Sequence, residues 1–146
     1  MKGNLFVHWL PVLLWALFIF ITSTNSNPYR SLPSSWARQT VQVQANPGSK
    51  RINFNELLGR YLHAAEYLIL AALIARAMIG RGDLHFNLLA MAFALSGLYA
   101  LSDEIHQHFV PGRAFEWSDL ALDLGGSVLG VVAFAYIFTL WRRRVH

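Results

Sequence analysis

The sequence predicts an all-α membrane protein, a bundle of about four transmembrane helices with a polar first loop. Of its 146 residues, 55% are hydrophobic and 14% are charged, whereas soluble domains carry about 25% charged residues. The apolar residues form four blocks, each long enough to cross a bilayer as a helix. A soluble helical bundle of this size has too little interior to bury so much apolar surface, so we reject that alternative.

The four blocks predict spans over about residues 5–22, 57–77, 84–101 and 119–141. Residues 23–55 form a polar loop of unknown role, and residues 102–118 form a second polar connection. We expect one membrane domain over residues 1–146. The chain has no cysteine, which excludes disulfides and Cys-based metal sites. It also lacks a phosphate-binding loop and a Rossmann glycine pattern, so we expect no nucleotide cofactor.

The basic residues predict the orientation of the spans. The charges beside the short turn at residues 79–83, together with the tail Arg142–Arg144, weigh more than those in the long loop. We therefore expect both termini in the cytoplasm. The tail indicates an anchor on anionic lipid, so we expect no nucleic-acid partner.

The acidic residues are expected to meet at one membrane face. Alternating spans bring together the start of the second span, the end of the third and the start of the fourth. His63, His106, His108 and Arg113 fall at this face. So do seven of the eight acidic residues, namely Glu56, Glu66, Asp103, Glu104, Glu116, Asp119 and Asp123.

Helical spacing predicts which of these side chains share a helix face. His63 and Glu66 are three residues apart, and Asp119 and Asp123 are four apart, so each pair projects from one side of its helix. Asp103 and Glu104 are adjacent and diverge by about 100°, so we expect only one of them to point inward. Ionisable groups inside a span are costly and usually mark a functional site.

Residues 101–113 carry a distinctive motif, which reads LSDEIHQHFVPGR. This motif resembles the signature of the VanZ-like family, named after a protein linked to resistance to the glycopeptide teicoplanin. The resemblance extends to His63–Tyr67, Ser118–Asp119 and Leu124–Gly126, and so covers about residues 57–131. Two features depart from the family pattern, namely Asp123, where family members often have Asn, and the long loop at residues 23–55.

The resemblance implies a small four-span protein of the bacterial cytoplasmic membrane, but it brings no agreed reaction. The candidate chemistry therefore comes from the clustered side chains. Acids and histidines suit proton transfer, and an Arg after a Pro-Gly turn suits an anionic headgroup. The candidate catalytic residues are His63, Glu66, Asp103, Glu104, His106 and Asp119. The candidate substrate-binding residues are Arg113, Gln107, Tyr67 and Asp123.

Other interpretations of the same residues stay open. The cluster is also compatible with a polar network that only holds the helices together. A divalent metal is a further alternative, with Asp103, His106 and Glu66 as candidate ligands, although no strict ligand motif is present. Arg113 is either an anion-binding residue or an interfacial partner of Glu116.

Three functions are compatible with the sequence. The first is an enzyme acting on a lipid or lipid-linked cell-wall precursor. The second is a non-enzymatic protein that binds a lipid or an antibiotic. The third is a small transporter, which four spans would support poorly unless the chain forms a homodimer.

Overall fold

The computed structural model contains four long helices and describes residues 5–24, 54–80, 82–111 and 113–145. In order these helices are α1 (Leu5–Thr24), α3 (Phe54–Ile79), α4 (Phe86–His108) and α5 (Trp117–Val145). Each helix is long and apolar enough to cross a membrane, and no strand occurs in the described part. The predicted fold class is therefore confirmed. Most of the loop predicted at residues 23–55 lies outside the described residues.

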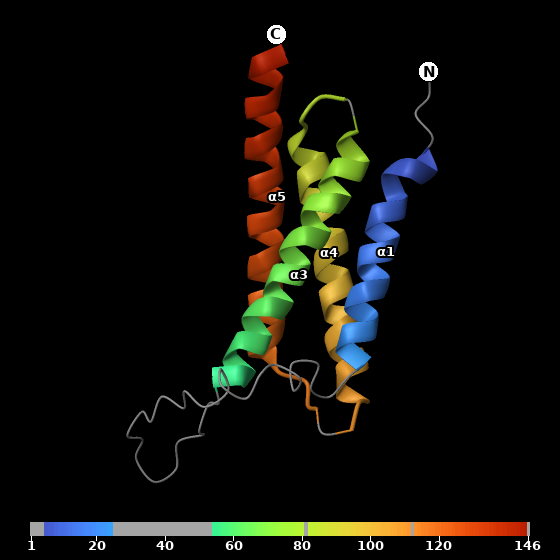
Figure 1. Ribbon diagram of the computed structural model, residues 1–146, viewed down its shortest axis with the longest axis vertical. Coiled ribbons are helices and arrows are strands. Elements are labelled where there is room, and N and C mark those ends of the chain that lie inside the picture. Colours follow the sequence, from blue (N-terminus) through green and yellow to red (C-terminus); the bar gives the residue numbers. More distant parts are fainter. Residues whose placement is uncertain (1–4, 25–53, 81, 112, 146) are drawn as a thin grey trace.

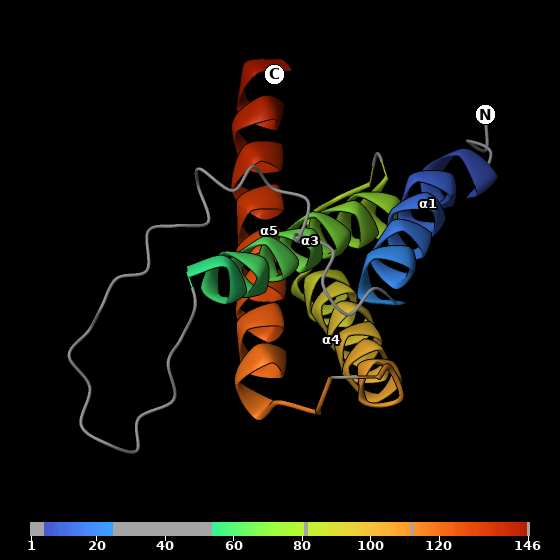
Figure 2. The same cartoon turned by 60° about the horizontal axis from the view of Figure 1, so that its bottom comes forward.

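The helices run alternately up and down, so the start of α1 and the end of α5 lie at the same end of the bundle (Figure 1). α3 packs most extensively against α5 and also contacts α4 and α1. Figure 1 shows α3 between α5 and α1, and in the second view α3 crosses α5 (Figure 2). α3 is therefore the central helix.

The outer surfaces of the helices are apolar, as expected for helices that face lipid. On α1, Leu13 and Leu14 are each 59% exposed. The interior holds small and aliphatic side chains together with a few polar ones. A soluble protein rarely exposes so many large apolar residues in contiguous stripes, so the exposure pattern fits a bilayer as solvent.

Each helix is longer than the predicted span, and the difference adds site residues at two helix ends. The third span was expected to end near residue 101, but α4 continues to His108. The first span was expected to end near residue 22, but α1 includes Ser23 and Thr24. In both cases the apolar run ends before the helix does, because the last turns direct polar side chains into the bundle.

The short turn between α3 and α4 follows the expected pattern. Gly80 has a positive φ of 55°, which glycine adopts without steric cost and which commonly ends helices. Its N–H bonds to the carbonyl of Arg76 at 2.9 Å. Nearby, Arg142 of α5 contacts the Asp83 carboxylate at 2.5 Å and the Gly82 carbonyl at 2.8 Å. These contacts join the end of α5 to the turn.

Candidate functional site

A histidine on α3 lies at the centre of the polar end of the bundle. His63 Nδ1 is 3.0 Å from Glu66 Oε2, one helical turn further along α3. On the other side of the ring, Nε2 is 3.1 Å from Asp103 Oδ2 of α4 and 3.6 Å from Asp123 Oδ2 of α5. One imidazole therefore contacts carboxylates from three helices.

Asp103 is the second centre of this network. Its Oδ2 accepts hydrogen bonds from Ser23 Oγ and from Gln107 Nε2, both at 2.8 Å. Gln107 Nε2 is also 3.3 Å from His63 Nε2. Because Ser23 belongs to α1, all four helices contribute to the site. We call the following residues the His63 cluster: Ser23, His63, Glu66, Asp103, Gln107 and Asp123.

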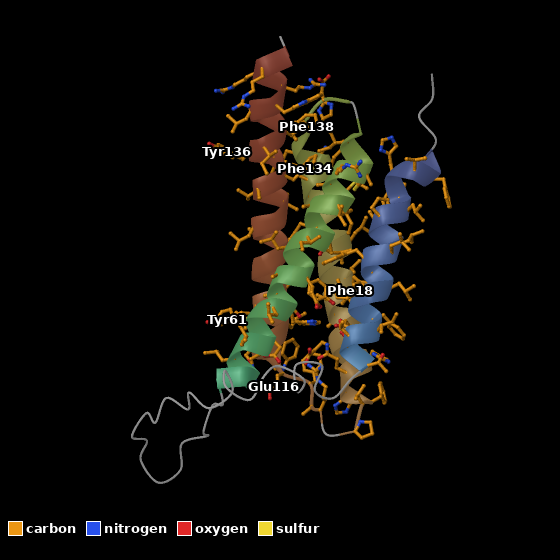
Figure 3. All side chains as sticks on the ribbon, in the orientation of Figure 1. Phe18, Tyr61, Glu116, Phe134, Tyr136 and Phe138 are labelled. Carbon is orange, nitrogen blue, oxygen red and sulfur yellow. The ribbon has the colours of Figure 1, made fainter. Side chains whose placement is uncertain are left out.

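A second group of charges lies closer to the helix ends. Arg60 of α3 donates to Asp119 Oδ1 at 2.6 Å and to Glu116 Oε2 at 2.5 Å. It also contacts Ser118 Oγ at 3.1 Å. Figure 3 shows Glu116 at this end of the bundle. Arg60 thereby ties the start of α3 to the start of α5.

The ion pairs of Arg60 and the contacts of His63 follow the same spacing along the parallel helices α3 and α5. Arg60 and His63 are almost one turn apart on α3, as are their partners Asp119 and Asp123 on α5. The predicted pairing of Asp119 and Asp123 on one helix face is consistent with this arrangement. Further from the polar end of the bundle, Ser96 Oγ and Ser127 Oγ are 2.8 Å apart, and both residues are fully buried.

Two glycines on α5 allow the close approach of α3. A Cβ at Gly126 would overlap the backbone carbonyl of Ala64, and one at Gly130 would overlap that of Leu68. Small residues spaced by four let membrane helices pack backbone to backbone. Since Ala64 follows His63 directly, this contact also sets the distance between His63 and Asp123.

Glu104 corrects one expectation. We expected only one of Asp103 and Glu104 to point inward, but their exposed fractions are 4% and 2%. Glu104 Oε1 accepts the backbone N–H of Glu116 at 2.7 Å. The connection between α4 and α5 folds back over Glu104, so a side chain that leaves the helix in a different direction from Asp103 is still covered.

Other predicted site residues lie beside the cluster rather than in it. The ring of His106 stacks on Phe20, with 4.7 Å between centroids. Within the described residues, no hydrogen bond or ion pair joins Arg113 to a carboxylate, and Glu116 pairs with Arg60 instead. The roles assigned to His106 and Arg113 therefore stay predictions.

Four buried polar atoms have no hydrogen-bond partner in the described part of the chain. Buried polar groups in proteins are nearly always paired with protein or water, and leaving one unpaired costs about 1–3 kcal/mol. The Tyr67 side chain is fully buried, and its ring lies edge-on to His63 at 5.2 Å. The four atoms are Tyr67 Oη, Asp103 Oδ1, Glu104 Oε2 and His106 Nδ1.

The candidate metal ligands are not assembled as a set. Across residues 5–24, 54–80, 82–111 and 113–145, no group of three or more His, Asp or Glu side chains is arranged to hold a metal ion. Asp103 and Glu66 both contact His63, whereas His106 stacks on Phe20. Metal binding stays a prediction that a metal assay on purified protein would test.

Sequence reasoning missed two residues of the site. Ser23 was assigned to a loop because it follows the last apolar residue of the first block. Arg60 was not among the candidate site residues. Its signal was present in the sequence, because Arg60 precedes His63 by three residues and so shares its helix face.

The motif around Asp103 and His63 thus corresponds to a physical cluster in the folded chain. A comparison with family models matches residues 7–140 to the VanZ/LLP1 family. The chain belongs to the VanZ/LLP1 family. This confirms the resemblance to the VanZ-like family, and the match includes all four spans. Searches of curated proteins and of solved structures gave no significant match.

Proposed function

We propose that this VanZ/LLP1 protein is an enzyme of the bacterial cell envelope that acts on a lipid or lipid-linked precursor headgroup. The observation that supports it best is His63, held between Glu66 and Asp103 inside a membrane span. Charged groups cost several kcal/mol in such a position. A network that only held the helices together would not need so many acidic residues, because the glycine contacts already pack α3 against α5.

The contacts divide the imidazole into two functional sides. Glu66 at Nδ1 orients the ring, as a carboxylate does in a catalytic triad. Nε2 then faces Asp103 and Asp123 and is the nitrogen that would exchange a proton with a reacting group. The unpaired Asp103 Oδ1 and Tyr67 Oη offer hydrogen-bonding capacity to a headgroup.

The reaction class that suits these groups is hydrolysis or transfer at a phosphoryl or acyl group. Acids and His63 would move protons, while Arg113 would bind the anionic group. Arg60 would position Asp119 and Glu116 at the entrance rather than contact the substrate, because both carboxylates already bond to it.

We further propose a location in the cytoplasmic membrane with both termini inside. The start of α1 and the end of α5 lie at one end of the bundle, where the Arg tail is found (Figure 1). The positive-inside rule would place that end in the cytoplasm. The His63 cluster would then lie in the outer leaflet, at the level of envelope precursors.

Profiling of lipids and cell-wall precursors tests the proposed function. Strains would carry the wild-type gene, a deletion, His63→Ala or Asp103→Asn, with Thr22→Ala as the control variant. The Thr22 hydroxyl bonds only to the carbonyls of Phe18 and Ile19 on its own helix. A lipid or precursor species that accumulates in the deletion should accumulate in both cluster variants and not in the control.

Protein abundance and teicoplanin susceptibility would be measured in the same strains. If Asp103→Asn restores the wild-type profile and susceptibility at equal abundance, the catalytic role of the cluster is wrong. The alternative is stoichiometric binding of a lipid or amphiphilic antibiotic, which the four unpaired buried atoms also support. It predicts a bound ligand on the purified protein and no changed lipid species.

A further inference from the structure

A second candidate site lies in the opposite half of the bundle from the His63 cluster. It is a groove of about 630 Å³ between the start of α4 and the second half of α5. Figure 3 shows Tyr136 in this region, far from Glu116 at the polar end. The walls include Phe86, Leu89 and Phe93 of α4 and Val132, Ala135 and Tyr136 of α5.

The groove walls face outward rather than into the bundle. Phe86 is 81% exposed, Tyr136 is 65% exposed and Val132 is 59% exposed. α1 packs against α3 and α4 and not along this part of α5. The groove is therefore open to the hydrocarbon of the bilayer.

The length of the groove corresponds to one leaflet. α5 has 29 residues, which at 1.5 Å per residue gives about 43 Å, close to the full bilayer with its headgroups. Its midpoint is near Val131. The lining residues of α5 extend from Val128 to Arg143, so the groove begins near the midplane and ends about 22 Å further along the helix, at headgroup level.

The headgroup end of the groove carries a positive charge. Arg143 lines the groove and is exposed. The preceding residue, Arg142, is already bonded to Asp83 and to the Gly82 carbonyl. No ion pair within the described residues involves Arg143. An apolar groove with one basic residue at its outer end complements an acyl chain below an anionic headgroup.

We propose that this groove binds an acyl chain of an anionic phospholipid from the leaflet in which α5 ends, with the lipid phosphate on Arg143. A second copy of the chain suits the groove less well. Its helix would have to bring an apolar face up to Arg143 and displace that charge from the headgroup layer, which is costly. The lipid satisfies both the apolar walls and the charge.

Native mass spectrometry of the full-length protein tests this proposal. The protein would be exposed to phosphatidylglycerol and phosphatidylcholine with identical acyl chains. Wild type should retain phosphatidylglycerol about fivefold more than phosphatidylcholine, the factor that corresponds to about 1 kcal/mol for one basic residue. Arg143→Gln should lose this preference for phosphatidylglycerol. Arg144→Gln should retain a larger preference than Arg143→Gln.

A groove-filling variant tests the acyl-chain part. Ala135→Trp should reduce retention of both lipids severalfold. Ile137→Trp is the matched control, because Ile137 is 64% exposed on the same helix but does not line the groove. To make the test independent of the folding of Ala135→Trp, wild type would also be labelled with phosphatidylglycerol that carries a photoactivatable acyl chain. Labelling should fall within residues 86–93 or 128–143.

Three results would overturn the proposal. The first is equal retention of the two lipids by wild type. The second is labelling confined to other segments. The third is efficient disulfide formation between two chains carrying Val132→Cys, which would identify the groove as an interface between copies.

Discussion

The contact between α3 and α5 depends on the absence of a side chain at Gly126. A Cβ there would overlap the backbone carbonyl oxygen of Ala64. That oxygen belongs to a regular helix and cannot rotate away, unlike the end of a flexible side chain. Gly126→Ala should therefore force the two helices apart. Gly125→Ala is the matched control, because nothing lies within 4 Å of a Cβ at that position.

The expected magnitudes follow from two opposing effects. Overpacking of a closely fitted site costs about 1–3 kcal/mol, and a clash with backbone belongs to the upper end of that range. Replacing Gly by Ala in a helix gains up to about 1 kcal/mol. Gly126→Ala should thus lower the free energy of unfolding by about 2 kcal/mol. Gly125→Ala should leave it unchanged or raise it by up to about 1 kcal/mol.

Unfolding of the two variants in the same detergent micelle, followed by circular dichroism, measures the difference. Gly126→Ala should also weaken any activity or binding that depends on the cluster, because Ala64 adjoins His63. Separation of α3 from α5 would lengthen the 3.6 Å distance from His63 Nε2 to Asp123 Oδ2. Equal stability of Gly126→Ala and Gly125→Ala would refute the backbone contact and the register derived from it.

Further predictions concern the polar contacts. Ser23→Ala removes a buried hydrogen bond to Asp103 and should cost about 1.5–3 kcal/mol of unfolding free energy, whereas Thr22→Ala, which loses only bonds within α1, should cost less. Arg60→Gln breaks half-buried ion pairs with Asp119 and Glu116 and should lower the free energy of unfolding by about 1–2 kcal/mol. Arg113→Gln is the control and should have a smaller effect. Equal effects of the two substitutions would contradict the role assigned to Arg60. Arg142, hydrogen-bonded to Asp83, holds the pKa of that carboxyl below its usual range. This contact is therefore complete above the usual carboxyl pKa and is lost as the pH falls through the lowered one. Arg142→Gln should raise the pKa of Asp83, measurable by NMR titration of the carboxyl carbon.

The sequence predicted the number of helices and the meeting of acids at one end for physical reasons. Four apolar blocks in a short chain leave membrane spans as the fold that satisfies both the side chains and the backbone. Alternating spans then decide which helix ends meet. The close approach at Gly126 and Gly130 was also readable, since their spacing is typical of packed membrane helices.

The parts that sequence reasoning missed are those in which tertiary contacts override local pattern. α4 was expected to end where its apolar run ends, but its last turns continue as helix because Asp103 Oδ2 accepts hydrogen bonds from Ser23 and Gln107. Only one of Asp103 and Glu104 was expected to point inward, because helical spacing does not show which later segment packs over a side chain. The backbone of Glu116 supplies that cover from twelve residues away.

The distribution of polar groups along the helices favours work at a headgroup over transport. On α5 the buried polar contacts next to the His63 cluster end at Ser127, and the next charged residue is Arg142. The intervening fourteen residues correspond to about 21 Å of helix, most of the bilayer's hydrocarbon core. On α3 no charged residue lies between Glu66 and Arg76. A transporter of one chain would need polar groups through this half, whereas an enzyme or binding protein needs only one polar end.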